Sequence, residues 1–129
     1  MTPEQAVTAV LETVDGLAGK VFPAEALKNA AAPFAFYLLD EDSEREALDG
    51  PTGLCSATLE VHCVARNYGE LVAMSAAVRS ALRGMQGQTF DGMLIERATV
   101  RQRSPDIKEV EVNLYRRMYV LQLDYQGGN

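Results

Sequence analysis

The ionisable side chains of this sequence are sorted by sign along the chain, and this sorting is its strongest chemical feature. Residues 1–64 contain eleven acids and three bases, whereas residues 65–129 contain seven acids and nine bases. Oppositely charged surfaces on one domain can bind each other between copies, and such head-to-tail contacts close into rings when the rotation allows it. The simpler alternative is a monomer with two solvated charged faces.

Two sets of side chains are therefore candidate contact residues between subunits. The acidic set lies in one short stretch and consists of Asp40, Glu41, Asp42, Glu44, Glu46 and Asp49. The basic set comes later and consists of Arg97, Arg101, Arg103, Arg116 and Arg117. The acids either line a channel, where they would repel phosphates, or meet the arginines of a neighbouring copy. We favour the second use slightly, because several ion pairs in one seam also fix its register.

The arginines at 97, 101 and 103 have odd numbers within one expected strand, which predicts that they share a face. The same face would carry Met93, Ile95 and Thr99. A stripe of this kind can bind phosphates, so a small nucleic-acid-binding module is an alternative function. No aromatic residues interleave with the arginines on this face, so base stacking is unsupported.

Catalytic and metal-binding patterns are not found in the sequence. His62 is the single histidine, so any Ser-His-Asp or Cys-His device would have to use it. Its place on the polar face of an alternating strand predicts a surface or interface histidine instead. The acidic stretch lacks the ligand spacing of a calcium loop, and no phosphate-binding glycine loop follows a strand. We expect a protein that is not an enzyme and that holds no metal or cofactor.

Composition and length indicate one domain spanning residues 1–129, with a flexible tail at 127–129. Hydrophobic residues make up 47% of the chain, which is ordinary for a globular protein. The pI near 4.7 argues against a general nucleic-acid binder and against anionic membranes. No run approaches the ~20 apolar residues of a membrane helix, and the N-terminus lacks the basic region of a signal peptide. We expect synthesis in a cytoplasm and no membrane partner.

The first half of the sequence predicts a helix followed by a long hairpin. Thr2 can cap a helix that runs to about Leu17, with Gln5 closing a capping box. A marginal strand at Val21-Phe22 and a loop at Ala24–Ala32 follow. Strands Phe34–Glu46 and Leu54–Arg66 are then expected to pair through a turn in Gly50–Gly53, which makes the hairpin tip acidic.

The alternating second arm of this hairpin predicts one buried face, shared by the odd-numbered residues from Cys55 to Ala65. The cysteines at 55 and 63 would stand roughly 26 Å apart along one strand, too far for a disulfide. They are expected to be buried structural thiols.

The second half predicts another helix and three strands. The helix begins at Asn67, with Glu70 completing a capping box, and ends at Gly84. The expected strands are Gln88–Phe90, Met93–Arg103 and Val110–Gln126, and a change of parity near Tyr115 predicts a bulge in the last one. We predict an α+β fold with an antiparallel-rich sheet of four to five strands, two helices mainly on one face, and a long central hairpin.

Several local strings, in their order and spacing, resemble the tail-completion or tail-terminator family of siphophage-like tails. The strings span about residues 3–126 and are Gly19-Lys20-Val21-Phe22-Pro23, Pro33-Phe34-Ala35-Phe36-Tyr37, Leu59–Ala65 with Asn67–Leu71, Val78–Gly84 and Leu114–Arg117. Prophages and gene transfer agents carry similar proteins. The acidic stretch Asp40–Asp49 departs from the pattern expected of this family.

The resemblance implies a structural virion protein at the head-proximal end of the tail. Such proteins form a ring, typically a hexamer, that terminates the growing tail tube and joins it to the head connector. The implied partners are further copies of the chain, the tail tube protein and the connector protein, with DNA only as passing cargo. A stopper protein of the connector is the alternative position within the virion. The resemblance implies no catalytic residues.

Overall fold

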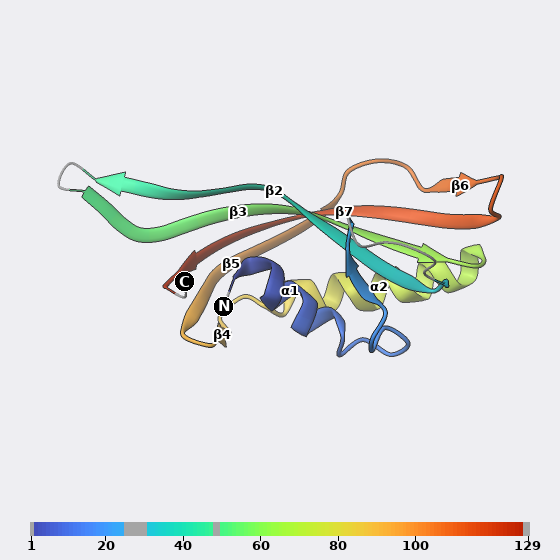
Figure 1. The fold of residues 1–129 in the computed structure, drawn as a ribbon, viewed down its shortest axis with the longest axis horizontal. Helices are drawn as coiled ribbons and strands as arrows, with labels where there is room; N and C mark the ends of the chain where they lie inside the picture. The colour runs from blue at the N-terminus through green and yellow to red at the C-terminus, as the bar shows by residue number, and fades with distance from the viewer. Residues whose placement is uncertain (1, 25–30, 48–49, 128–129) are drawn as a thin grey trace.

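The computed structural model describes residues 2–24, 31–47 and 50–127, with only the backbone described for the strand residues among 45–52. Two helices lie on the same side of a long curled sheet (Figure 1). The elements follow in the order α1 (Pro3–Leu11), β1 (Val21–Pro23), β2 (Phe34–Ala47), β3 (Gly50–Ala65), α2 (Tyr68–Arg83), β4 (Thr89–Phe90), β5 (Met93–Gln102), β6 (Ile107–Glu109) and β7 (Leu114–Gln126). The α+β class and the placement of both helices on one face are confirmed.

The sheet is larger than the four to five strands that the sequence predicts, and it is mixed. Its order is β1-β2-β3-β7-β5-β4, with β6 also pairing with β7. All described pairings are antiparallel except that of β1 with β2. Strands β1 and β4 correspond to the strands predicted at Val21-Phe22 and Gln88–Phe90, whereas β6 was not predicted as a separate strand. Such short strands are stabilised mainly by the strands that they pair with rather than by their own residues.

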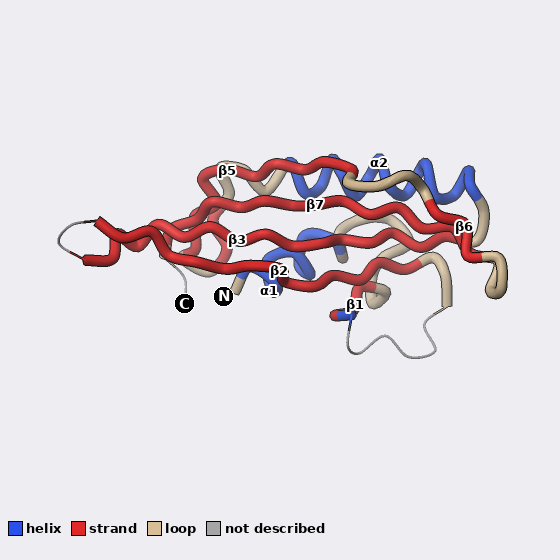
Figure 2. The backbone as a smooth tube through the Cα atoms, turned by 90° about the horizontal axis from the view of Figure 1, so that it is seen from above, coloured by secondary structure: helices blue, strands red, loops and turns tan. Residues whose placement is uncertain are grey.

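Two long hairpins build most of the sheet, as Figure 2 shows from above. The predicted hairpin of β2 and β3 is confirmed, with irregular register between Leu39 and Glu41 and again between Glu44 and Glu46. In the second hairpin β5 and then β6 pair along the same strand, β7. The β2–β3 hairpin extends beyond the helices at one end of the molecule (Figure 1).

Helix α1 begins as predicted and ends earlier. The Thr2 hydroxyl accepts from Gln5 N while the Gln5 side chain accepts from Thr2 N, which completes the capping box. The helix ends at Leu11 rather than near Leu17, because the next backbone bonds run over three residues, including Thr13 to Val10. Leu17 is nevertheless fully buried. The apolar spacing therefore correctly predicts a buried residue at this position, although the position lies beyond the end of the helix.

Helix α2 begins at the predicted cap. The Asn67 side chain accepts from Glu70 N at 2.8 Å. The Glu70 carboxylate does not return to Asn67, as a capping box would require, and accepts instead from the backbone and guanidinium N–H groups of Arg66.

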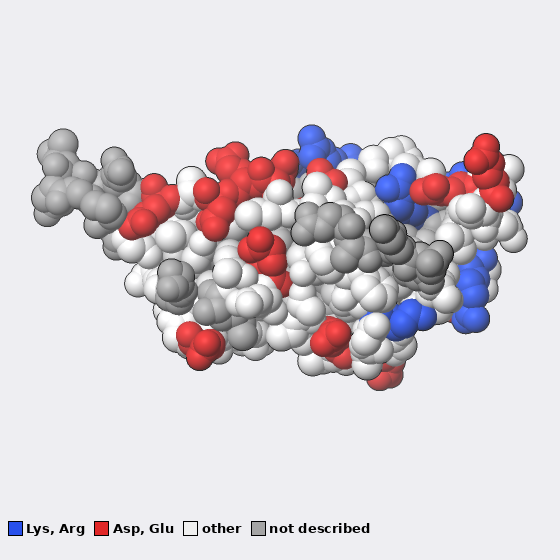
Figure 3. Space-filling view, in the orientation of Figure 1, with Lys and Arg blue, Asp and Glu red and all other residues white. Residues whose placement is uncertain are grey.

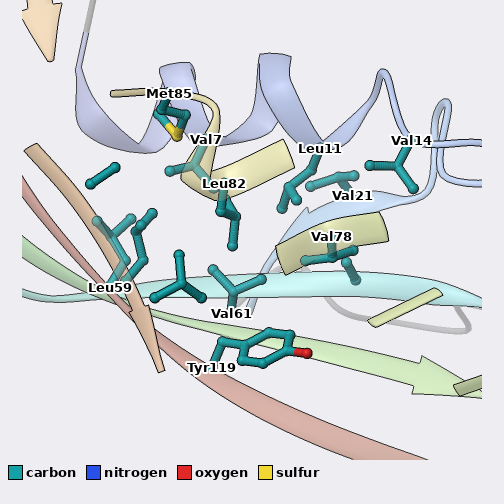
Figure 4. Packing of buried hydrophobic residues seen from close by; sticks show 14 of the residues in the cluster. Val7, Leu11, Val14, Val21, Leu59, Val61, Val78, Leu82, Met85 and Tyr119 are labelled. Atoms are coloured by element: carbon teal, nitrogen blue, oxygen red, sulfur yellow. The ribbon is translucent and has the colours of Figure 1, made fainter. Parts of the chain in front are cut away.

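The core lies between the helices and the face of the sheet that is turned toward them, called the lower face below. Its fully buried side chains include Leu11, Leu82, Leu59, Leu121 and Tyr119, and Figure 4 shows several of these meeting from both layers. The odd-numbered residues Ala57–Ala65 of β3 are buried as the alternation predicts. Cys63 belongs to this core, and its burial raises the pKa of its thiol to about 12. Cys55 is partly buried, and both cysteines are free, as expected.

The last strand starts later than its apolar pattern predicts. Residues 110–113 form a turn between β6 and β7, with Asn113 in a left-handed conformation at φ 53°. The predicted change of parity near Tyr115 therefore reflects this turn rather than a bulge within β7. The expected loop at Ala24–Ala32 and the expected tail at 127–129 fall largely on residues 25–30 and 128–129, outside the described part of the chain.

Candidate assembly surface

The face of the sheet turned away from the helices, called the outer face below, carries polar and charged side chains from β3, β5 and β7. On β3 these are the even-numbered residues, such as Thr58 and Glu60. Cross-strand pairing carries the same face through β7 to β5. No helix covers it in Figure 1.

The β5 arginines lie on the outer face, with a different set of neighbours from the one that odd numbering predicts. A register shift between Ile95 and Arg97 inserts an extra residue and reverses the parity of the strand. Met93 and Ile95 are therefore fully buried beneath the sheet, whereas Arg97, Thr99 and Arg101 are exposed. The prediction that Met93 and Ile95 share the arginine face is wrong.

Arg97 and Arg101 form no ion pair with any residue of the described ranges. Arg103, just past the end of β5, lies 3.9 Å from Glu60 Oε2 across the outer face. Two exposed guanidinium groups are thus available to a partner, and a third is only loosely engaged.

The remaining two arginines of the predicted basic set serve the fold itself. Arg117 donates two 2.8 Å hydrogen bonds to Asp106, which also accepts from the Tyr68 hydroxyl. These bonds lower the pKa of the Asp106 carboxyl, chiefly through Arg117, and raise that of Arg117. Arg116 pairs with Glu109 at 3.1 Å on the outer face.

The acidic side chains lie along the other margin of the sheet. Asp40, Glu41, Asp42 and Glu44 of β2 are exposed. Asp42 accepts a 2.8 Å hydrogen bond from the Tyr125 hydroxyl, and Glu44 accepts from the backbone N–H of Gly53. Within the described part of the chain none of these acids pairs with an arginine of β5. The Glu46 side chain and Asp49 lie outside the described residues.

Figure 3 shows where the charges lie on one side of the molecule. Acidic side chains gather on the hairpin side of this view, and the basic side chains lie in its middle and at the opposite end, where acidic side chains lie as well. Across the sheet, strands β3 and β7 separate the acids of β2 from the arginines of β5.

His62 lies on the outer face as predicted, but it is only 6% exposed rather than solvent-facing. Its ring stacks on Phe36 at 4.4 Å, and its Nε2 lies 3.1 Å from Glu60 Oε1. Burial lowers the pKa of the ring, and the Glu60 hydrogen bond opposes this shift only in part. A histidine that is buried, stacked on Phe36 and bonded to Glu60 has the contacts of a structural residue.

Exposed apolar side chains at two places were not singled out from the sequence. Val110 and Val112 in the β6–β7 turn are 79% and 59% exposed. On α2, Tyr68 and Val72 are 49% and 42% exposed. The sequence placed Val110 and Val112 in the last strand and made no prediction of burial for Tyr68 and Val72, so only the fold reveals them as surface residues.

The described residues contain no group of three or more His, Cys, Asp or Glu side chains that could hold a metal ion. Among the described helices none is long and apolar enough to cross a membrane. What the arrangement offers is surface chemistry: a row of carboxylates at one side of the sheet, unpaired guanidinium groups at the other, and exposed apolar side chains near the second.

Comparisons with known proteins relate the chain to a tail completion family. The sequence matches the family model "Tail completion protein gp17" over residues 2–119. A chain in a solved structure titled "Virion of native gene transfer agent (GTA) particle" has a similar fold, with a TM-score of 0.56 and 18% sequence identity over 92% of this chain and 86% of that chain. At this identity the likeness shows the fold alone. No curated protein sequence matches the chain.

Proposed function

This chain belongs to the Tail completion protein gp17 family of virion tail proteins, and we propose that it forms a ring at the head-proximal end of the tail tube. The ring terminates growth of the tube and joins the tail to the head connector. Its partners are further copies of itself, the tail tube protein and the connector protein, and DNA passes through as cargo.

The observation that supports a ring is the separation of charge between the two sides of the sheet. Asp40, Glu41 and Glu44 lie on the β2 side, and Arg97 and Arg101 lie unpaired within the described residues on the β5 side. A contact between two different surfaces of the same chain repeats from copy to copy, and it closes when the rotation per copy divides the circle. We propose six copies, as the family resemblance implies.

The proposed role requires no catalytic step. The ring contacts combine apolar burial, which supplies most of the affinity, with charge, which selects the orientation. A nucleic-acid-binding role is less well supported, because acidic residues lie among the arginines. Asp124 stands opposite Arg97 on the neighbouring strand β7, and Glu60 lies near Arg103.

Labelled particles test the position of the protein in the virion. We expect a gold label on a C-terminal tag to appear at the junction of tail and head in purified particles. Particles produced without the protein should have tails of irregular length that carry no heads, because nothing stops the tube or joins it. A label at the distal tip, or normal joined tails without the protein, would contradict the proposal.

A further inference from the structure

The sheet has a margin at β2 whose backbone hydrogen-bonding groups no described strand pairs. β1 covers this margin only at Ala35–Tyr37. The Ala35 N–H bonds to the carbonyl of Lys20, so Ala35 turns its backbone groups outward. In a strand the backbone N–H and C=O groups of every second residue point to the same side. The backbone groups of Leu39 therefore point outward, as those of Ala35 do. We call Leu38–Glu44 the β2 margin.

A second uncovered margin lies at β5, on the opposite side of the sheet in Figure 2. β4 pairs only with Met93 and Leu94. The Ala98 N–H turns outward and is bonded by the Gln86 side chain at 3.1 Å. By the same alternation the backbone groups of Val100 and Gln102 turn outward, where no described strand meets them. We call Arg97–Gln102 the β5 margin.

Uncovered sheet edges bind other strands unless something prevents it. The charges on these two margins determine which pairs of margins attract each other and which repel. Two β2 margins repel each other through their carboxylates, and two β5 margins repel each other through Arg97 and Arg101. A β2 margin and a β5 margin attract. The pattern disfavours a two-fold dimer and favours a head-to-tail contact, the kind that closes into a ring.

We propose that the β2 margin of one copy adds as a strand to the β5 margin of the next, so that one sheet runs continuously around the ring. This inference rests on the proposed ring and specifies its interface. The strand directions agree with it: β2, β3, β7 and β5 are successively antiparallel, so β2 and β5 run in opposite directions. Copies placed side by side in one orientation therefore pair these strands antiparallel.

The register within the sheet shows which side chains such an addition brings together. Glu41 pairs with Thr58, Thr58 with Gln122, and Gln122 with Thr99. If this row continues into the next copy, Glu41 comes to lie opposite Thr99. It is then diagonal to Arg97 and Arg101, within reach of long side chains on the same face.

Exposed apolar residues lie near both margins. Tyr68 of α2 reaches Asp106 in the β5–β6 connection, and Val72 follows four residues later on the same side of the helix. Figure 2 shows α2 extending past the β5 side of the sheet. Leu39 is exposed at the β2 margin and shares the helix-facing side with Leu59. If the row Leu39–Leu59–Leu121–Val100 continues into the next copy, Leu39 comes to lie opposite Val100, on the side of the sheet that faces the helices.

Hydrogen exchange read by mass spectrometry tests the backbone contact directly. The wild-type protein is compared as monomer at low concentration and as oligomer at high concentration. We expect the outward-turned, unbonded amides of the two margins, such as those of Leu39, Val100 and Gln102, to exchange at least tenfold more slowly in the oligomer. Amides in the turn at 110–113 serve as the internal control and should not change.

Cysteine cross-linking tests the register. Glu41→Cys and Thr99→Cys are made singly and together, with the wild type as control for Cys55 and Cys63. Within one chain the two positions are three strand spacings apart, roughly 14 Å, which excludes an internal bridge. Under oxidation the double variant should give a covalent ladder ending at the ring, and a mixture of the two single variants should give linked dimers only.

The outcomes separate this inference from the proposed function. An oligomer whose two margins exchange as fast as in the monomer overturns strand addition and leaves the ring intact. Dimers formed by Glu41→Cys alone would show β2 paired with β2 and overturn the head-to-tail arrangement. A wild-type protein that stays monomeric at every concentration, even with tail tubes present, overturns both proposals together.

Discussion

The two faces of the sheet share the same strands and differ in what covers them. The lower face meets α1 and α2 through fully buried side chains such as Leu59 and Leu121. Among the described residues the outer face has buried positions at Phe34, His62, Val64 and Val120, surrounded by half-buried and exposed side chains. Most fully buried side chains therefore lie on one face, whereas the outer face and the two margins remain available for assembly.

The sharpest contrast between the faces is expected from truncating neighbouring residues of β3. Leu59→Ala removes a fully buried side chain and should lower the free energy of unfolding by about 2–5 kcal/mol. Thr58→Ala, adjacent on the outer face, should change it by less than about 0.5 kcal/mol. Urea denaturation measures both, and equal losses would show that the outer face stabilises the fold as much as the core does.

A second prediction concerns the ion pair that fixes the β5–β6 connection. Asp106→Asn weakens the bonds from Arg117 and Tyr68 and should cost about 1–3 kcal/mol at pH 7. Because the pKa of Asp106 is lowered by folding, its contribution is complete above the ordinary carboxyl pKa of about 3.9 and is lost as the pH falls through its lower folded value.

The difference between wild type and Asp106→Asn, followed by denaturation from pH 7 to pH 2, should therefore shrink on acidification. Glu70→Gln is the control, because the Arg66–Glu70 pair is solvent-exposed on the Arg66 side and should contribute far less. A wild-type advantage that grows on acidification would contradict the account.

Charge reversal at the β5 margin should affect assembly and spare the fold. Arg97→Glu with Arg101→Glu places acids opposite the acids of β2, and we expect association to weaken roughly tenfold or more, equivalent to about 1.4 kcal/mol or more. Arg83→Glu, an exposed reversal at the end of α2, is the control. Sedimentation velocity measures association and thermal denaturation measures folding; an unchanged association constant for the double variant removes the arginines from the interface.

The smallest expected effect belongs to His62. Its pKa is lowered by burial, so as the pH falls below about 6.5 the unfolded chain binds a proton before the folded protein does. Wild-type stability should therefore decline in that range by at most about 1.4 kcal/mol per pH unit. His62→Gln should reduce this slope between pH 8 and pH 5, and an unchanged slope would show that other groups produce it.

Local chemistry in the sequence was sufficient to predict parts of the fold. The caps at Thr2 and Asn67, the alternation from Cys55 to Ala65 and the β2–β3 hairpin depend on neighbouring residues or on one turn, and the structure contains all of them. The family resemblance was also confirmed by the match over residues 2–119.

What was missed depends on contacts between distant segments. The parallel pairing of β1 with β2 has no local pattern. The irregularity between Ile95 and Arg97 occurs without glycine or proline, so the parity of the arginines could not be read from their numbers. Val110 and Val112 are apolar yet exposed in a turn, which strand patterning cannot distinguish from a strand end. The charge sorting predicts an assembly surface, which stays a prediction, and only the sheet order shows that the two signs lie at opposite margins.

In the proposed ring, opposite sides of one sheet bind each other between copies. Sedimentation equilibrium over a hundredfold range of protein concentration, at low and high salt, measures whether they do. We expect one oligomer mass that stops growing once the ring is complete and that dissociates more readily in high salt. A mass that stays monomeric throughout, or one that rises without limit as in an open filament, would contradict it.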